Sequence, residues 1–171
     1  HTAHCAMPYL PRHIGRTLPE AHVTIRFPMT QPIVGCIPNF SEGQRPEIVC
    51  DIAESIRAVP DTALIDLSSD ADHNRSVLTF AGPPQAVAAA AFSAIATAAE
   101  LIDMNRQQGE HPRIGATDVV PFVPLANITM EECVAIAYAL GKRVGTELGI
   151  PVYLYERAAT CPQRKNLADV R

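Results

Sequence analysis

The sequence Arg75-Ser76-Val77-Leu78-Thr79-Phe80, followed by Gly82-Pro83-Pro84, contains the clearest change of pattern in the chain. Polar and apolar residues alternate up to Phe80, which is typical of a strand with one buried face. The glycine and the prolines end this strand, and proline is favoured in the first turn of a helix. We therefore expect a helix over residues 84–102, whose many alanines allow close packing on a sheet. Its apolar side carries Val87, Ala91, Ile95 and Ile102.

The same succession of strands and helices extends toward the N-terminus. Residues 33–37 and 63–67 are short apolar runs that predict strands. Between them, residues 45–58 predict an amphipathic helix, because apolar residues recur there at four-residue spacing. A polar loop over residues 68–73 leads into the strand that ends at Phe80. The apolar face of the helix carries Ile48, Val49, Ile52, Ala53 and Ile56.

Three more elements are predicted toward the C-terminus. Residues 119–123 predict a strand, in which Pro121 lacks an amide hydrogen and therefore indicates an edge or a bulge. A helix over residues 129–148 opens with a capping-box signature and ends at Gly149. Residues 151–155 predict the last strand.

The predicted order of elements is βαββαβ, followed by one more αβ unit. The first six elements match the split βαβ, or ferredoxin-like, arrangement. We therefore predict an α/β fold of the two-layer α+β type over residues 29–171, in which helices cover one face of a mixed sheet.

The composition of the chain indicates its general class and the kinds of partner it could bind. The 171 residues suffice for one domain with a hydrophobic core, and 47% of them are hydrophobic. The 14 basic and 18 acidic residues give a net charge of −4 without a basic stripe, so nucleic acid is not expected as a partner. No apolar run reaches the roughly 18 to 20 residues of a membrane span. The 5 cysteines are scattered, which favours reduced thiols in a cytoplasmic protein.

The first 28 residues differ from the rest of the chain. They hold four of the six histidines and show neither a periodic apolar face nor the apolar core of a signal peptide. We expect Met29 to be the natural start, and residues 1–28 to be upstream translation or a poorly ordered extension. The alternative is a genuine additional segment.

Chemistry is most strongly indicated in the loop Gly109-Glu110-His111-Pro112-Arg113-Ile114-Gly115-Ala116-Thr117-Asp118. It places an imidazole between an acid and a guanidinium, where a helix pattern ends and a strand pattern begins. A histidine near its free pKa of about 6.5 is a natural proton carrier at neutral pH. The alternative is an ordinary helix-terminal loop with a partly exposed histidine.

Three other segments are weaker candidates. The turn at residues 38–43 would point backbone amides at an anionic ligand, although a simple helix cap at Ser41 explains it equally well. Residues 70–75 could hold a divalent metal, but a turn with a hydrogen-bonded Asn74 is favoured and no metal is expected. The tyrosines near 153–156 are expected in the core or on the sheet, or stacked on a ring ligand.

Several motifs in a fixed order resemble one known family. They are Val34–Gly43, Asp72–Val77, Leu101–Met104, Gly109–Asp118 and Val152–Tyr155. Together they resemble the N-terminal subdomain of glutamate formimidoyltransferase, the folate enzyme of histidine breakdown.

The resemblance runs from about Ile33 to Arg171 and implies several properties. These are a ferredoxin-like fold, a homodimer, and transfer of the formimino group from N-formimidoyl-glutamate to N5 of tetrahydrofolate, the co-substrate. The family's catalytic histidine corresponds to His111. N-formylglutamate is the alternative donor.

The residue types fit this chemistry. N5 of the pterin loses a proton and the departing glutamate nitrogen gains one, and a single histidine can do both in turn. The acid that supports His111 is Glu110, Asp118 or Asp66. Substrate carboxylates are expected to bind Arg113 or the amides of the loop that contains Asn39, Ser41 and Gly43.

The family has a second subdomain, and its folate lies in the groove between the two. The present sequence ends where the linker to that half would begin. We therefore expect either a fragment or a one-subdomain relative with weak or no activity. The alternative function is a non-catalytic folate-binding or dimerisation module on the same fold.

Overall fold

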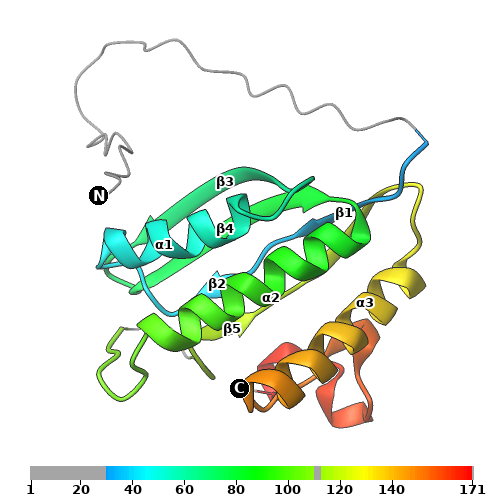
Figure 1. Cartoon of the computed structure of the whole chain (residues 1–171). Coiled ribbons are helices and arrows are strands. Elements are labelled where there is room, and N and C mark those ends of the chain that lie inside the picture. Colours follow the sequence, from blue (N-terminus) through cyan, green and yellow to red (C-terminus); the bar gives the residue numbers. More distant parts are fainter. Residues whose placement is uncertain (1–29, 110–112, 171) are drawn as a thin grey trace, which may run out of the picture.

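The computed structural model describes residues 30–109 and 113–170 (Figure 1). The expectations for residues 1–28 and for Glu110 and His111 lie outside these ranges. The described chain forms an α/β fold with three α-helices and a six-stranded sheet. None of the helices in this part of the chain combines the length and the apolar character that crossing a bilayer requires.

The strands form one curled sheet. In chain order they are β1 (Ile33–Cys36), β2 (Asn39–Phe40), β3 (Ala63–Asp70), β4 (Arg75–Gly82), β5 (Thr117–Val119) and β6 (Phe122–Ala126). The sheet order is β5-β2-β4-β1-β6, and β3 pairs with β4.

Every pairing among the described strands is antiparallel, so the predicted mixed sheet is wrong. The reason lies in the connections. After β2, helix α1 (Pro46–Arg57) leads to β3, which lies on the far side of β4 from β1 and β2. Strand β3 then forms a hairpin with β4, and its described pairing is with β4 alone. As a result, each described strand has only antiparallel neighbours.

Prolines lie at two interruptions of the sheet, and the first is followed by a short strand within the segment that the sequence predicts as a turn. Pro38 separates β1 from β2, and both segments pair with β4. Pro121 separates β5 from β6, and both are edge strands of the sheet, which confirms the edge position predicted from its missing amide hydrogen. The carbonyl of Pro121 accepts a hydrogen bond from the Ile37 amide at 3.2 Å, so the two breaks lie against each other.

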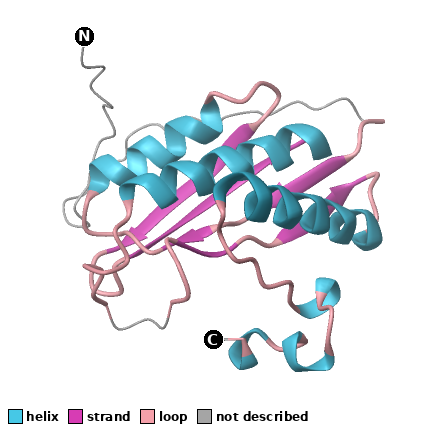
Figure 2. Ribbon diagram, turned by 60° about the horizontal axis from the view of Figure 1, so that its bottom comes forward, coloured by secondary structure: helices cyan, strands magenta, loops and turns pink. Residues whose placement is uncertain are grey.

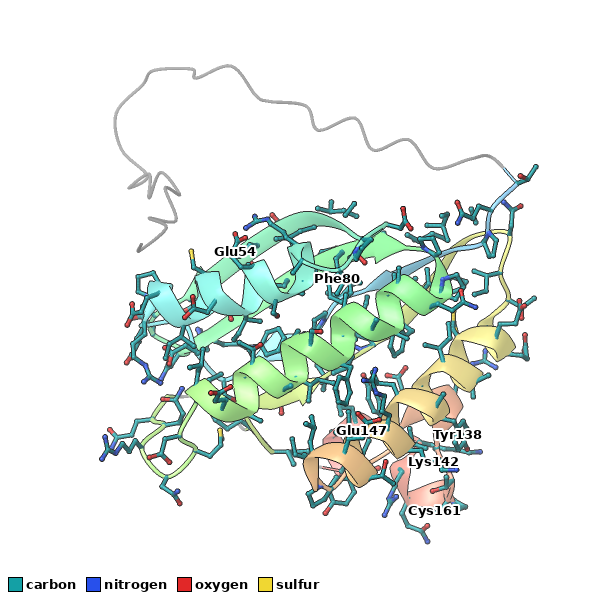
Figure 3. All side chains as sticks on the ribbon, viewed as in Figure 1. Glu54, Phe80, Tyr138, Lys142, Glu147 and Cys161 are labelled. Carbon is teal, nitrogen blue, oxygen red and sulfur yellow. The ribbon has the colours of Figure 1, made fainter. Side chains whose placement is uncertain are left out.

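Helices α1 (Pro46–Arg57) and α2 (Pro84–Leu101) cover one face of the sheet (Figures 1 and 2). Buried apolar residues recur on α1 as predicted, and the buried alanines of α2 let it approach the strands closely. Figure 3 contrasts Phe80, which is fully buried in the core, with Glu54, which lies on the outer side of α1. The expected helices at 45–58 and 84–102 are thus confirmed.

Helix α3 (Met130–Arg143) lies beside α2 near β6 (Figure 1). Its capping box is confirmed, since Thr129 Oγ1 accepts from the Glu132 amide and the Glu132 carboxylate accepts from the Thr129 amide. The helix continues as one π-helical stretch, η1 (Val144–Leu148), and stops at Gly149 with φ of 68°.

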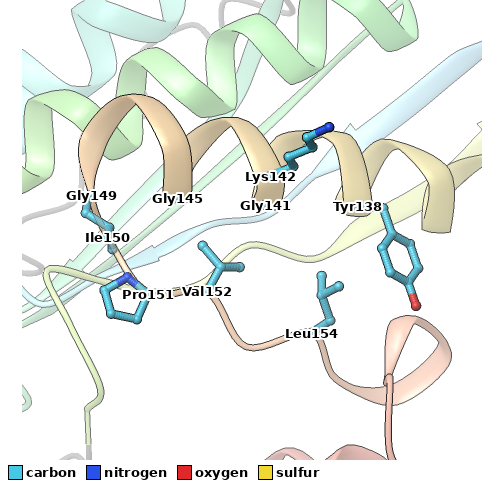
Figure 4. A pocket seen from close by; sticks show the side chains of 9 residues that line it. All are labelled: Tyr138, Gly141, Lys142, Gly145, Gly149, Ile150, Pro151, Val152 and Leu154. Atoms are coloured by element: carbon cyan, nitrogen blue, oxygen red, sulfur yellow. The ribbon is translucent and has the colours of Figure 1, made fainter.

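The predicted strand at residues 151–155 is wrong. This segment runs beneath α3, where Gly141 and Gly145 leave room for it (Figure 4). A Cβ on Gly141 would lie 3.2 Å from Val152 Cγ1, so Val152 packs directly on the helix. The segment thus packs on a helix instead of joining the described sheet, and Val152 and Tyr153 stay 41% and 48% exposed. Three short 3-10 turns follow, at residues 156–158, 162–164 and 167–169.

Candidate functional site

Three loops meet at one end of the sheet, at the lower left of Figure 1. They are residues 41–45 between β2 and α1, residues 70–75 between β3 and β4, and residues 102–116 between α2 and β5. We call their described residues the loop cluster. Side chains from each loop bond to the others, so segments far apart in sequence form one polar unit.

Asn74 lies at the centre of the loop cluster and is 2% exposed. Its φ of 47° falls in the left-handed region, which asparagine tolerates better than most residues. Its Oδ1 accepts from the Gly43 amide at 2.9 Å, and its Nδ2 donates to the Gln108 carbonyl at 2.9 Å and to Gln107 Oε1 at 3.3 Å. The hydrogen-bonded turn expected at Asn74 is therefore confirmed.

Glu42 places a fully buried carboxylate beside this turn. Its Oε1 accepts from the amides of Gln44 and Arg45 at 2.9 Å each, and its Oε2 accepts from Arg45 Nε at 2.7 Å. Burial alone would raise the pKa of this carboxyl, but these hydrogen bonds and the Arg45 charge bring the pKa below its ordinary value. Glu42 is thus an ionised anchor for the start of α1.

Ser41 connects the first loop to the third. Its Oγ donates to the Gly115 carbonyl and its amide donates to the Ala116 carbonyl, each at 2.8 Å. Its own carbonyl accepts from Gln107 Nε2. A helix cap at Ser41 is therefore wrong, because α1 begins at Pro46 and its N-cap residue, Arg45, makes no side-chain cap.

The amides of this first loop do not form an open anion site. The amide of Ser41 bonds to the third loop, and the amide of Gly43 bonds to the Asn74 side chain. These two amides already have partners within the chain, and the binding of a substrate carboxylate by this loop stays a prediction. Asn39 is buried in β2, where its Nδ2 donates to the Ile37 carbonyl at 2.9 Å.

Two glycines allow the loops to approach this closely. A Cβ on Gly43 would lie 2.6 Å from the Arg75 amide nitrogen, and a Cβ on Gly109 would lie 2.6 Å from the His73 carbonyl oxygen. Real Cβ contacts are essentially never so short. Both glycines are therefore required by packing.

The acidic turn at residues 70–73 is built by hydrogen bonds. Asp70 Oδ1 accepts from the amides of Asp72 and His73, and Asp70 Oδ2 lies 2.9 Å from His73 Nδ1. The His73 amide and ring, which bond to this carboxyl, lower the pKa of Asp70. Within residues 30–109 and 113–170, no three histidine, cysteine, aspartate or glutamate side chains gather as metal ligands.

Of the other candidate residues predicted from the sequence, some lie at the loop cluster and one lies away from it. Arg113 donates to the carbonyls of His73 at 2.9 Å and Asn74 at 3.3 Å, and so belongs to the loop cluster. Asp118 accepts from the Ile114 amide at 3.1 Å and shapes the end of the same loop. Asp66 instead lies opposite Thr79 within the sheet, four residues before Asp70. That spacing corresponds to roughly 13 Å along the strand.

A cavity of about 570 Å³ adjoins the loop cluster. It lies between residues 114–123, α3 and the segment at 150–158, and its lining is largely apolar. A second cavity of about 490 Å³ lies where this segment passes under α3 (Figure 4). Sequence analysis missed both, because residues 151–155 were assigned to the sheet.

We compared the sequence with models of known protein families. The model of the formiminotransferase domain, N-terminal subdomain, matches residues 33–171. The chain belongs to this family. The match includes all three loops of the cluster and the segment that runs under α3, whereas residues 1–32 lie outside it.

Named relatives agree with the family. The chain is 52% identical over 139 residues to glutamate formimidoyltransferases from Streptococcus pyogenes serotype M1 and from Thermoplasma acidophilum. It is 50% identical over 139 residues to the formimidoyltransferase-cyclodeaminase of Gallus gallus. The matches cover 81% of this chain, 46% of each microbial relative and 26% of the Gallus gallus protein. The chain thus spans about half the length of the first two relatives.

Two residues of this formiminotransferase subdomain were missed as site residues by sequence reasoning. Glu42 and Gln107 both bond within the loop cluster, although they are 65 positions apart. A signal was present for Glu42, because an acid between serine and glycine just before a helix is a common source of capping hydrogen bonds. Gln107 carries no comparable local signal.

Proposed function

We propose that this chain forms the N-terminal half of a formimidoyltransferase active site. The reaction is transfer of the formimino group from N-formimidoyl-glutamate to N5 of tetrahydrofolate. The observation that carries the proposal is the 52% identity to two proteins named glutamate formimidoyltransferase, over a range that contains the whole loop cluster. The ligands are small molecules, and a compact polar end beside a cavity suits them.

In this proposal His111 moves the protons. N5 of the pterin attacks the amidine carbon and forms the N5–carbon bond of a tetrahedral intermediate. His111 takes the proton from N5 and gives it to the glutamate nitrogen, whose bond to that carbon then breaks. The formimino group remains on N5, and glutamate leaves as the free amine.

Described residues on both sides of His111 in the sequence support this role. Gln108 and Arg113 bond to the buried turn at Asn74, so the loop is tied to a rigid part of the fold. Of the three acids considered, Asp118 in β5 bonds to the Ile114 amide of this loop and Glu110 is the neighbour of His111 in sequence, whereas Asp66 lies in β3. We therefore propose Asp118 or Glu110 as the group that orients the imidazole.

The order of the strands supports a ferredoxin-like topology. If β1 with β2, and β5 with β6, each count as one interrupted strand, the antiparallel order is β3, β4, β1–β2 and β5–β6. This order is the one expected for a split βαβ fold of four strands. We extend the proposal to a homodimer, which the family resemblance implies, and to a cytoplasmic location, which the scattered cysteines favour.

The experiment that tests the proposal replaces the matching 139 residues of the Streptococcus pyogenes relative with residues 33–171 of this chain. The chimera is expected to transfer the formimino group from N-formimidoyl-glutamate and to discriminate against N-formylglutamate. A folded chimera that binds a tetrahydrofolate analogue without turnover would favour the alternative function, a non-catalytic folate-binding module. Dimerisation without folate binding would favour a dimerisation module.

A further inference from the structure

The loop between α2 and β5 is attached at both of its described ends to the same two residues. On the N-terminal side, Asn74 Nδ2 donates to the Gln108 carbonyl, and Gly109 packs against the His73 carbonyl. On the C-terminal side, Arg113 donates to the carbonyls of His73 and Asn74. The turn at residues 73–74 therefore fixes the positions of the residues on either side of 110–112.

Asparagine is the residue type that this position requires. The φ of 47° disfavours most side chains. The side chain must also accept from the Gly43 amide and donate to the Gln108 carbonyl, and it is almost fully buried, so water does not replace these partners. Glycine would adopt the backbone but lacks both groups, and aspartate would keep the acceptor but lacks the donor.

We propose that Asn74 is a positioning residue for the transfer reaction, which holds in place the described residues that flank His111, namely residues 107–109 and Arg113. This inference rests on the proposed function, because it takes His111 as the proton carrier. Asn74 acts through the loop and not on the substrate. A small displacement of a catalytic group lowers the rate strongly, so a buried and fully bonded anchor beside it has a clear physical purpose.

Three variants of the 171-residue chain test the hydrogen bonds of the Asn74 side chain separately. Asn74→Gly removes all three side-chain bonds without backbone strain. Asn74→Asp keeps the bond to the Gly43 amide and loses the bonds to the Gln108 carbonyl and to Gln107 Oε1. Asn127→Gly is the matched control, because Asn127 also has a positive φ, of 51°, and bonds through its side chain to the Gln31 carbonyl, outside the loop cluster.

The first readout is amide hydrogen exchange by NMR. Asn74→Gly should accelerate exchange of the Gly43 amide by about fivefold or more, the factor that corresponds to a typical net hydrogen bond. Asn74→Asp should leave this amide protected. Both variants should accelerate exchange at residues 107–109 and 113–116, and Asn127→Gly should not.

The second readout is the pH titration of the His111 imidazole resonance, assigned with His111→Gln. The midpoint should move in both Asn74 variants and stay unchanged in Asn127→Gly, with all variants folded by circular dichroism. Unchanged exchange in the loop, an unchanged His111 titration, or equal effects in the control would each overturn the proposal. These measurements need no turnover. If His111→Ala leaves transfer by the chimera intact, the proton-carrier role of His111 fails, while the anchoring of the loop is still decided.

Discussion

At the scale of the residue, Glu42 shows how the loop cluster is stabilised. A buried carboxylate is costly unless it is paired, and here amides and a guanidinium satisfy it. Arg45 itself is 43% exposed, so the ion pair is partly screened and the backbone hydrogen bonds matter more. Glu42 thereby joins the start of α1 to the loops of the site.

Glu42→Gln should lower the free energy of unfolding at pH 7 by about 1–3 kcal/mol, because charge-assisted bonds to a buried group are lost. The folded pKa of Glu42 is lowered, so its contribution is fully present above the unfolded pKa of about 4.3 and is lost as pH falls through the folded pKa. The gap between wild type and variant should therefore shrink below about pH 4.

Urea unfolding of the wild type and the variant measures the difference in unfolding free energy at pH 7 and at pH 3. Glu54→Gln is the matched control, since Glu54 pairs with Arg57 in an exposed i,i+3 bridge of α1 and should contribute little. If the two variants lost equal stability at pH 7, Glu42 would not be the anchor described here.

A second residue-scale prediction concerns Gly109. Gly109→Ala places a Cβ against the His73 carbonyl and should displace the loop, with a stability loss of about 1–3 kcal/mol from overpacking. Gly115→Ala in the same loop meets its nearest atom at 3.6 Å and is the control. Gly109→Ala should lower both the melting temperature of the chain and the transfer rate of the chimera. Equal behaviour of the two variants would show that the close approach at Gly109 is not required.

At the scale of the element, periodicity predicted the helices well but did not predict the pairing of the strands. Residues 45–58 and 84–102 carry apolar faces that only a helix can bury together, and both form helices. Residues 151–155 have the composition of a strand, yet Val152 packs on Gly141 of α3. Local composition cannot distinguish a strand of the sheet from an extended segment that packs on a helix.

The same limit applies to the site. The turn at Asn74 was predictable, because asparagine forms local hydrogen bonds and tolerates a positive φ. The burial of Glu42 could not be predicted, because it depends on Gln107 and on loops that come together only when the chain folds. The antiparallel pairing likewise depends on which strands become neighbours, and the local pattern of each strand does not indicate this.

The capping box of α3 provides a test at this scale. Thr129→Ala removes the bond to the Glu132 amide and should cost about 1 kcal/mol, or roughly 2–4 °C in melting temperature. Thr146→Ala is the control, because its hydroxyl bonds only to carbonyls of its own helix, at Lys142 and Arg143. A loss of stability as large for Thr146→Ala would argue against the cap.

At the scale of the whole molecule, two helices cover one face of the sheet and the loop cluster occupies one end of it. The chain spans 46% of its microbial relatives, and the resemblance places folate in a groove between two halves. A binding groove with only one wall leaves more of its ligand in water. The 171-residue chain should therefore bind a tetrahydrofolate analogue much more weakly than the chimera does, as measured by titration calorimetry. Equal affinities would place the whole pterin site in this half.

The rate of formimino transfer by the chimera, with His111 present or replaced, tests the central claim most directly. His111→Ala should lower the rate by about 10²–10⁴-fold, the usual effect of losing a general acid–base group, while affinity for tetrahydrofolate changes little. Glu54→Gln is the control, because Glu54 lies on the outer side of α1 with its side chain 58% exposed, and its rate should stay near that of the unmodified chimera. A His111→Ala chimera that transfers the group at the unmodified rate would contradict the account.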